Sequence, residues 1–95
     1  MILEFTGELT YWRGPSPYHF ISVPVDESAL LHDASASVTY GWGMIPVAVT
    51  LGNTEWTTSL FPKDGGYLVP VKGSVREAEG LGLGDSAAVR LSLTL

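Results

Sequence analysis

The fold of this chain is decided by its C-terminal stretch, 59-SLFPKDGGYLVPVKGSVREAEGLGLGDSAAVRLSLTL-95. Its apolar runs and turn residues predict a strand, a tight turn, a second strand, one short helix, a sharp turn and a last strand. Asp64, Gly65 and Gly66 accept the positive φ angles that tight turns require, so residues 63–66 indicate a hairpin. Pro70 has no N–H to give to a ladder, which indicates that its strand ends or lies at an edge there.

The helix in this stretch is marked at both ends. Ser74 and Glu77 have the spacing of a capping box, in which each side chain accepts a hydrogen bond from the other residue's backbone N–H. Gly80 is placed to end the helix in a left-handed conformation. Residues 87–95 then alternate apolar and polar side chains, which is the period of a half-buried strand.

Residues 59–81, followed by Gly84-Asp85 and the alternating strand, resemble a small bacterial family known as domain of unknown function 1905. The likeness covers nearly the whole chain and is strongest from Trp56 to Asp85. It implies a double-split β-barrel capped by short helices, and it implies no particular activity. More distantly, the order Pro70, Arg76, Gly82-Leu83, Gly84-Asp85 is similar to the AbrB-like swapped-hairpin DNA-binding proteins, which usually build the barrel from two chains.

The first half of the chain predicts a similar succession of elements. Residues 2–13 alternate as a strand in which Gly7 marks a bulge or a bend. Asp26 is the expected N-cap of a short helix that ends at Asp33, with Leu30 and Leu31 facing the core. Further strands are expected over residues 18–23, 38–42, 45–51 and 55–61.

A weak internal repeat relates the two halves. Val23-Pro24-Val25 recurs 46 positions later as Val69-Pro70-Val71, and each copy lies between a hairpin and a short helix. One such unit leaves an open sheet edge, so two units are expected to close one barrel about a pseudo-twofold axis. The predicted fold class is all-β with two short helices: a small double-split β-barrel of two similar halves, one domain over residues 1–95.

Composition narrows the classes of function. The net charge of −5, from ten acidic and five basic residues, makes a nucleic-acid partner unexpected, because such binding needs a basic face. Four of the five bases nevertheless lie in residues 47–95. The chain has no cysteine, no signal-peptide pattern and no apolar run of transmembrane length. A cytoplasmic protein without a membrane partner is therefore expected.

Motifs for catalysis or metal binding are weak. His19 and His32 are the only histidines, and neither belongs to an H-x-x-H or Cys/His cluster, so no metal and no cofactor are expected. Ser59, His19 and Asp64 have the residue types of a catalytic triad, but no nucleophile elbow surrounds the serine. The glycine-rich residues 80–85 follow a helix and precede a strand, which is the reverse of a phosphate-binding loop.

Aromatic residues are the other candidates for ligand contact. Trp12, Trp42, Trp56 and the four tyrosines supply rings that can stack on a ligand. In a small barrel most of them are expected to fill the core or the barrel ends. The alternative is that some of them line a shallow apolar groove.

The candidate ligand site lies at the start of the second helix, where backbone N–H groups favour an anion. The residues expected there are Lys63 from the hairpin tip, Lys72, Gly73, Ser74 and Arg76, with Trp56 or Tyr67 as an apolar wall. The expected ligand is a small anion-bearing molecule or the end of an acidic peptide, since a guanidinium and an ammonium suit carboxylate or phosphate.

A competing interpretation gives these bases no ligand. Arg76 then pairs with Asp85 to fix the helix to the following turn, and Lys72 is a solvated surface charge.

The sequence favours a non-enzymatic binding or interaction module. The alternatives are a DNA-binding transcriptional regulator of the swapped-hairpin kind and a small hydrolase or lyase. Because both barrel halves lie in one chain, a folded monomer is expected, or a homodimer through an exposed strand edge.

Overall fold

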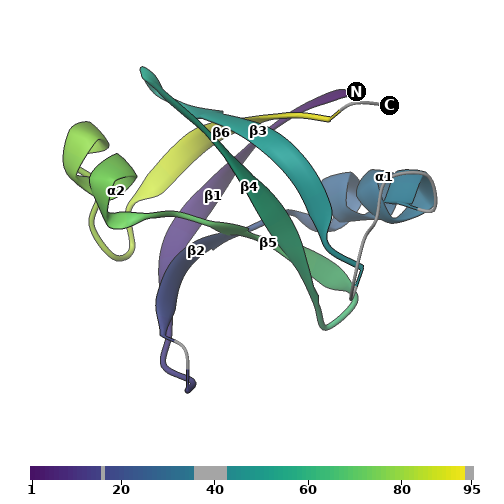
Figure 1. Ribbon diagram of the computed structural model, residues 1–95, viewed down its shortest axis with the longest axis horizontal. Helices are drawn as coiled ribbons and strands as arrows, with labels where there is room; N and C mark the ends of the chain where they lie inside the picture. The colour runs from purple at the N-terminus through teal and green to yellow at the C-terminus, as the bar shows by residue number, and fades with distance from the viewer. Residues whose placement is uncertain (16, 36–42, 94–95) are drawn as a thin grey trace.

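The strands of the protein close into one antiparallel barrel, in a computed structural model that describes residues 1–15, 17–35 and 43–93 (Figure 1). Around the barrel the strands follow the order β1-β2-β5-β4-β3-β6. The elements along the chain are β1 (Ile2–Trp12), β2 (Tyr18–Ser22), α1 (Val25–Ser35), β3 (Ile45–Leu51), β4 (Thr54–Lys63), β5 (Gly66–Pro70), α2 (Gly73–Glu79) and β6 (Ser86–Ser92). The predicted class, all-β with two short helices, is confirmed.

Two long strands are each shared between two sheets. β1 pairs with β6 over residues 2–8 and with β2 over residues 9–12. β4 pairs with β3 over residues 54–60 and with β5 over residues 61–63. Each long strand therefore leaves one sheet and enters the other, and the barrel is split twice. We call β1-β6-β3-β4 the first sheet and β1-β2-β5-β4 the second sheet.

The chain contains two halves with the same order of elements, as predicted. The halves are β1-β2-α1-β3 and β4-β5-α2-β6, and their equivalent strands pair with one another, β2 with β5 and β3 with β6. Equivalent elements in the middle of the two halves are 48 residues apart in the sequence. β2 begins at residue 18 and β5 at residue 66, and α1 begins at residue 25 and α2 at residue 73.

The backbone hydrogen bonds agree with this offset. The N–H of Val23 donates to the Tyr67 carbonyl, and the N–H of Val71 donates to the His19 carbonyl. Val23 is thus equivalent to Val71, and not to Val69 as the Val-Pro-Val repeat suggests. The predicted offset of 46 is wrong by two residues, which is one period of a strand and leaves every side chain on the same face.

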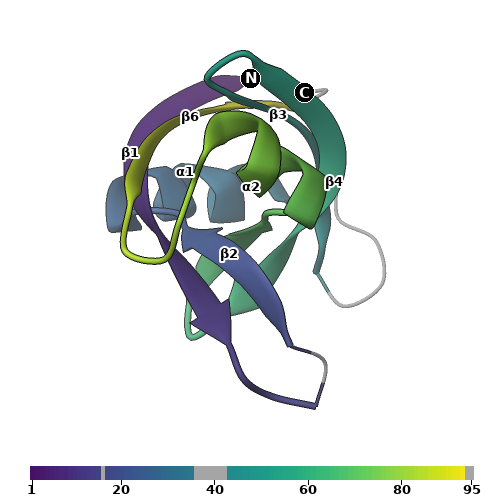
Figure 2. The same ribbon diagram turned by 90° about the vertical axis from the view of Figure 1, so that its left-hand side faces the viewer.

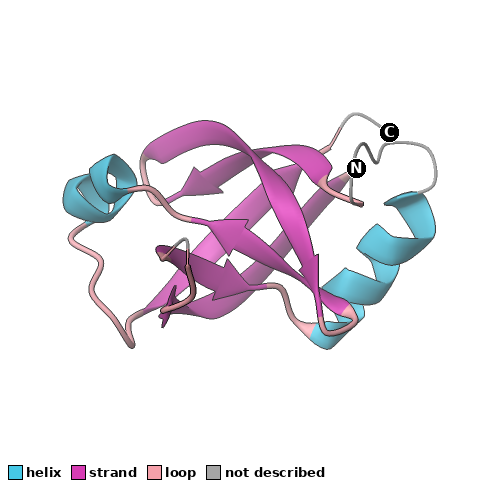
Figure 3. Ribbon diagram, turned by 60° about the horizontal axis from the view of Figure 1, so that its bottom comes forward, coloured by secondary structure: helices cyan, strands magenta, loops and turns pink. Residues whose placement is uncertain are grey.

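Apolar side chains from every strand fill the barrel. Leu9, Ile21, Val49, Val69 and Leu91 are at most 1% exposed. Burying a side chain of this kind stabilises the fold by roughly 1.5–3 kcal/mol. The helices lie at opposite ends of the barrel (Figure 3). Neither helix is long and apolar enough to span a membrane, within the residues that the structure describes.

Helix α1 covers one barrel end with one of its two adjacent leucines. Leu31 is fully buried, as predicted, whereas Leu30 is 49% exposed. Successive helical residues point about 100° apart, so only one of the pair faces the core. The helix begins at Val25, which places Asp26 in its first turn and not at the predicted N-cap.

Helix α2 begins earlier than predicted. Its N-cap is Lys72, which makes no side-chain capping bond. The Lys72 carbonyl accepts hydrogen bonds from the N–H groups of Val75 and Arg76, and so Ser74 lies inside the first turn. The predicted capping box between Ser74 and Glu77 is therefore wrong, because the chain enters the helix as soon as β5 pairing ends.

The turn predictions are confirmed. Asp64 and Gly65 have φ angles of 51° and 81°, the two positive values that a tight hairpin turn of this type requires. Gly80 has φ 60° and donates its N–H to the carbonyls at the end of α2. β5 ends at Pro70. The predicted strand over residues 38–42 lies outside the described residues, as do residues 94–95.

Gly7 marks the place where β1 passes from the first sheet to the second. It pairs with Ala87 in an unbroken register, so the pairing with β6 contains no bulge here. A Cβ at residue 7 would lie 2.4 Å from Ile21 Cγ2 and 3.2 Å from the Ser22 carbonyl oxygen. Glycine therefore permits the close approach of β1 and β2 at the split.

We expect Gly7→Ala to destabilise the protein by about 1–3 kcal/mol, because the added methyl group overpacks against Ile21 and the Ser22 backbone. Thermal unfolding measures this as a lower midpoint. The control is Gly66→Ala, whose Cβ would meet its nearest neighbours at 3.5 Å or more. Equal losses in the two variants would contradict this account of Gly7.

A polar contact fastens α2 to the β3–β4 hairpin. The Thr54 hydroxyl donates to the Glu79 carboxylate at 2.5 Å. Gly52, in the same hairpin, has φ 60°, and a Cβ there would overlap this carboxylate. The hairpin tip thus accepts the Glu79 side chain only because residue 52 is glycine.

A double-mutant cycle between Thr54→Val and Glu79→Ala is expected to give a coupling free energy of about 1 kcal/mol in urea unfolding, since one partly buried hydrogen bond joins the pair. Glu77→Ala, on the same helix, serves as the uncoupled control. Strictly additive effects of the two substitutions would show that the contact does not hold α2 to the hairpin.

Candidate functional site

The residues predicted as one ligand site lie in two places. Lys63 pairs with Gly66 at the tip of the β4–β5 hairpin, whereas Lys72 follows the far end of β5. Six residues of extended chain separate positions 66 and 72, a span of up to about 20 Å. Figure 1 shows this tip and α2 on opposite sides of the barrel. Lys63 therefore does not join the bases at α2.

The other predicted site residues divide between surface and core. Lys72, Gly73 and Ser74 are exposed at the start of α2, a helix of seven residues. Trp56 and Tyr67 are only 8% and 6% exposed and belong to the hydrophobic core. Their rings fill the barrel, so they do not form the expected apolar wall beside Lys63.

Arg76 has no acidic partner among the described residues. Its Nε is buried and makes no hydrogen bond with any described residue. The Asp85 carboxylate instead accepts a hydrogen bond from the Gly82 N–H at 2.8 Å and closes its own turn. Among the described residues the one ion pair joins Arg90 and Glu4. The structural interpretation that pairs Arg76 with Asp85 is therefore wrong.

His19 lies within the electrostatic influence of Arg76. Its ring packs on Tyr11, with the ring centroids 4.7 Å apart. Burial, and secondly the positive charge of Arg76, lower the pKa of His19 below its ordinary value. The imidazole is thus held neutral at pH 7, as a polar group packed against an aromatic ring.

The outer surface of the second sheet carries an apolar hollow that we call the aromatic groove. It has a volume of about 780 Å³. Its lining residues are Trp12, Pro15, Pro17, Tyr18, Phe61, Pro62, Lys63, Leu68 and Pro70. They come from the β1–β2 hairpin, the end of β4 and β5. The alternative that some aromatic residues line a shallow groove is therefore confirmed for Trp12 and Tyr18.

Lys63 forms one wall of the aromatic groove. Its Nζ lies 3.4 Å from the centroid of the Trp12 ring, and Trp12 is 37% exposed. A cation–π contact at such an exposed position is worth about 0.5–1 kcal/mol. The contact fixes a positive charge beside an apolar surface, where a ligand can meet both.

Three further rings cover the same face. The Tyr18 ring lies 5.7 Å from Phe20 and 5.9 Å from Phe61, tilted at about 50° to each. Leu68 pairs with Phe61 across β5 and β4, is 6% exposed, and lines the aromatic groove without belonging to the main core cluster. Burial raises the pKa of Tyr18, which keeps its hydroxyl group a hydrogen-bond donor.

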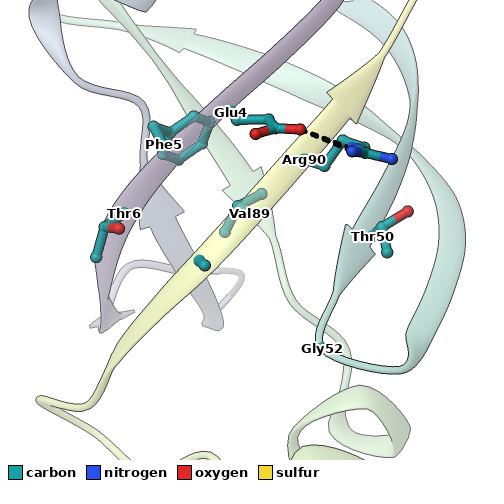
Figure 4. A pocket seen from close by; sticks show the side chains of 8 residues that line it. Glu4, Phe5, Thr6, Thr50, Gly52, Val89 and Arg90 are labelled. Atoms are coloured by element: carbon teal, nitrogen blue, oxygen red, sulfur yellow. Dashed lines mark hydrogen bonds and ion pairs between the residues drawn. The ribbon is translucent and has the colours of Figure 1, made fainter.

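The outer surface of the first sheet is polar. Its hollow, of about 550 Å³, is lined by Glu4, Thr6, Thr50 and Arg90 among others (Figure 4). Arg90 donates from Nε and Nη2 to Glu4 Oε1 at 3.0 and 2.8 Å across β6 and β1. Both side chains are more than half exposed, so this pair contributes little to stability. This face is an ordinary solvated surface.

The sequence contains a pattern that indicates the groove. In β2, Tyr18 and Phe20 alternate with His19 and Ile21, so both faces of the strand carry large rings or apolar groups. A strand with one solvated face alternates with polar residues instead. The pattern predicts that both faces of β2 are packed against other groups, but it does not show which other strands contribute residues to the groove.

No group of three or more His, Asp or Glu side chains is arranged to hold a metal ion in the part of the chain that the structure describes.

We expect Arg76→Gln to raise the pKa of His19 toward 6.5 without reaching it, because the charge of Arg76 is removed and burial remains. NMR titration of the imidazole measures this. Because the pKa of His19 is lower in the folded chain, the unfolded chain binds the proton at a higher pH than the folded chain does. The contribution of His19 to stability is therefore lost as the pH falls below 6.5. Arg90→Gln is the control, and an unchanged His19 titration in Arg76→Gln would contradict the assignment.

Comparison with known proteins identifies the family of this chain. No curated protein matches the chain. The family model described as Domain of unknown function (DUF1905) matches residues 5–91, which reaches from β1 to β6. The match covers nearly all of the 95 residues, and this protein belongs to the DUF1905 family.

Proposed function

We propose that this protein is a non-enzymatic binding module whose ligand lies in the aromatic groove. The ligand presents an apolar body to Trp12, Tyr18 and Phe61 and an anionic group to Lys63. One observation carries the proposal: the Lys63 ammonium group lies on the Trp12 ring at the wall of an apolar groove of about 780 Å³. The groove thus presents to one ligand both a surface for stacking and a positive charge for its anionic group.

The contrast between the two sheets supports a binding role. Outward positions of the first sheet carry Glu4, Thr6 and Arg90, whereas those of the second sheet carry Tyr18 and Phe61. A contiguous exposed apolar patch on a soluble domain commonly marks an interaction site. The volume of the groove also falls in the usual range of about 300–1,000 Å³ for ligand sites.

The charge of the side chains that line the groove favours an anionic ligand. The chain has a net charge of −5, but screening limits the reach of a charge to about 8 Å at physiological salt. Among the residues that line the aromatic groove, the one charged side chain is that of Lys63, whereas Asp64 lines a neighbouring hollow. We propose the same two ligand classes, a small anion-bearing molecule or the end of an acidic peptide, and of the predicted bases we keep Lys63 and not Lys72 as the one that meets the anion.

The same charges make a duplex DNA partner a weaker proposal. Neutralising phosphates needs clustered Lys and Arg, and the five basic residues face ten acidic ones. Because one chain closes the barrel through β1 and β4, we propose a monomer as the working unit, in the cytoplasm and away from membranes.

The test uses 2-naphthoate as an aromatic anion, titrated into ¹⁵N-labelled protein. We expect saturable shifts of the Trp12 indole N–H and of the Tyr18 and Lys63 amides. Lys63→Gln should weaken binding about two- to fivefold, the worth of an exposed ion pair, and Trp12→Ala by fivefold or more, as for an interface anchor. Lys72→Gln is the matched control and should leave the affinity unchanged.

Two results would overturn the proposal. One is the absence of saturable binding at millimolar naphthoate. The other is a set of shifts centred on Arg76 and Lys72 and sensitive to Lys72→Gln, which would return the site to the start of α2.

A further inference from the structure

The aromatic groove is long and open. Its lining includes Lys63, which pairs with Gly66 at the start of β5, and Pro70, which ends that strand. It thus runs the length of β5, whose five residues span about 16 Å. A second hollow of about 260 Å³ shares Lys63 and Leu68 with it. An extended ligand fits this shape better than a compact one.

The backbone of the two central strands of the second sheet, β2 and β5, is not available to a ligand. β2 pairs with β1 and β5, and β5 pairs with β2 and β4. A peptide that lies over β2 and β5 therefore finds no free edge on these two strands to join as an added strand, which is one way for an extended peptide to bind a sheet. It must bind through its side chains against the outward surface.

A polyproline II helix meets this requirement. It has no internal hydrogen bonds, its backbone stays solvated, and five residues rise about 16 Å. Its proline rings pack in grooves lined by aromatic residues. The side chains of the groove wall are rings, prolines and Leu68, with three polar groups, the Trp12 indole N–H, the Tyr18 hydroxyl and the Lys63 ammonium. The hydroxyl suits a peptide carbonyl, and the ammonium suits a carboxylate.

We infer that the aromatic groove binds a proline-rich peptide in the polyproline II conformation, with an acidic residue placed beside Lys63. This inference rests on the proposed function and names its partner. The prolines lie on Trp12, Tyr18 and Phe61, and the acidic residue meets the charge held on Trp12. The positive wall rejects a basic residue at the same place.

The experiment measures binding of capped eight-residue peptides by ¹⁵N-detected titration. The probe has seven prolines and one central aspartate. The comparison peptides replace the aspartate with lysine, or the prolines with alternating glycine and serine. We expect the aspartate–proline peptide to bind about two- to fivefold more tightly than the lysine–proline peptide, as for an exposed charge pair, and the glycine–serine peptide not to saturate.

Reversing the charge at Lys63 is the more stringent test of the inference. Lys63→Glu should reverse the preference between the aspartate and lysine peptides, while Lys72→Glu leaves the preference unchanged. Both residues lie at or near the surface, so neither variant is expected to unfold the barrel. Trp12→Ala should weaken both peptides fivefold or more. Ile2→Ala is its control, because Ile2 is a 62% exposed side chain at the other end of β1.

The outcomes separate the inference from the proposed function. If 2-naphthoate binds at Lys63 and no proline peptide does, the peptide inference falls and the binding module stands. If the glycine–serine peptide binds as well as the proline peptide, the polyproline II conformation is wrong. Tighter binding of a thymidine octamer would assign the rings to single-stranded nucleic acid and also overturn the inference. Absence of both naphthoate and peptide binding overturns both proposals.

Discussion

The sharing of β1 and β4 between two sheets is the constraint on which the rest of this structure depends. Each long strand uses its first part for the first sheet and its last part for the second sheet. The two sheets therefore close one barrel through these shared strands, although neither sheet closes by itself. Gly7 lies at this transition in β1, where a side chain would collide with Ile21 and the Ser22 backbone. The helices then cover the two ends that the split leaves open (Figure 2).

This closure decides where a partner can bind. In the order β1-β2-β5-β4-β3-β6 every strand has a neighbour on both sides, and the core is filled by close-packed apolar side chains. Recognition is left to the outward side chains and the hairpin tips. On the first sheet most of these are small, polar or charged, with the exposed Ile2 as an exception. On the second sheet they are aromatic, and the face is hollowed beside Lys63.

The parts of the fold that depend on local chemistry could be predicted from the sequence. Asp64-Gly65 and Gly80 require positive φ angles, and these were readable from residue type alone. The alternation of β6 gave its buried face. Helix starts were not readable, because α2 begins where β5 pairing with His19 ends, and that is a long-range contact. The repeat was placed two residues from its true offset for the same reason: pairing, and not the Val-Pro-Val identity, sets the register.

The candidate site was predictable only in part, again because of distance along the chain. Lys63 was chosen from the sequence, but its neighbours were taken from the following helix, 9 residues on at Lys72. The structure gives it Trp12 instead, from the other half of the chain. The sequence predicts Trp56 or Tyr67 as an apolar wall of the site because both are near the hairpin in sequence. The inward face of each strand is fixed by its partners, and these place both rings in the core.

The pseudo-twofold relation explains why such a site arises at this place. Trp12 pairs with Tyr18 at the end of β1, and Lys63 pairs with Gly66 at the end of β4. Tyr18 and Gly66 are the first residues of the equivalent strands β2 and β5, so Trp12 and Lys63 occupy equivalent positions in the two halves. Their contact therefore joins the two halves across the axis of the second sheet. With the same residue in both positions, two tryptophans or two lysines would face each other, and the surface would lack either its charge or its ring. Because the two halves differ at this pair of positions, the same groove has both an aromatic ring and a cation. The barrel stays closed because the inward residues of both halves are apolar.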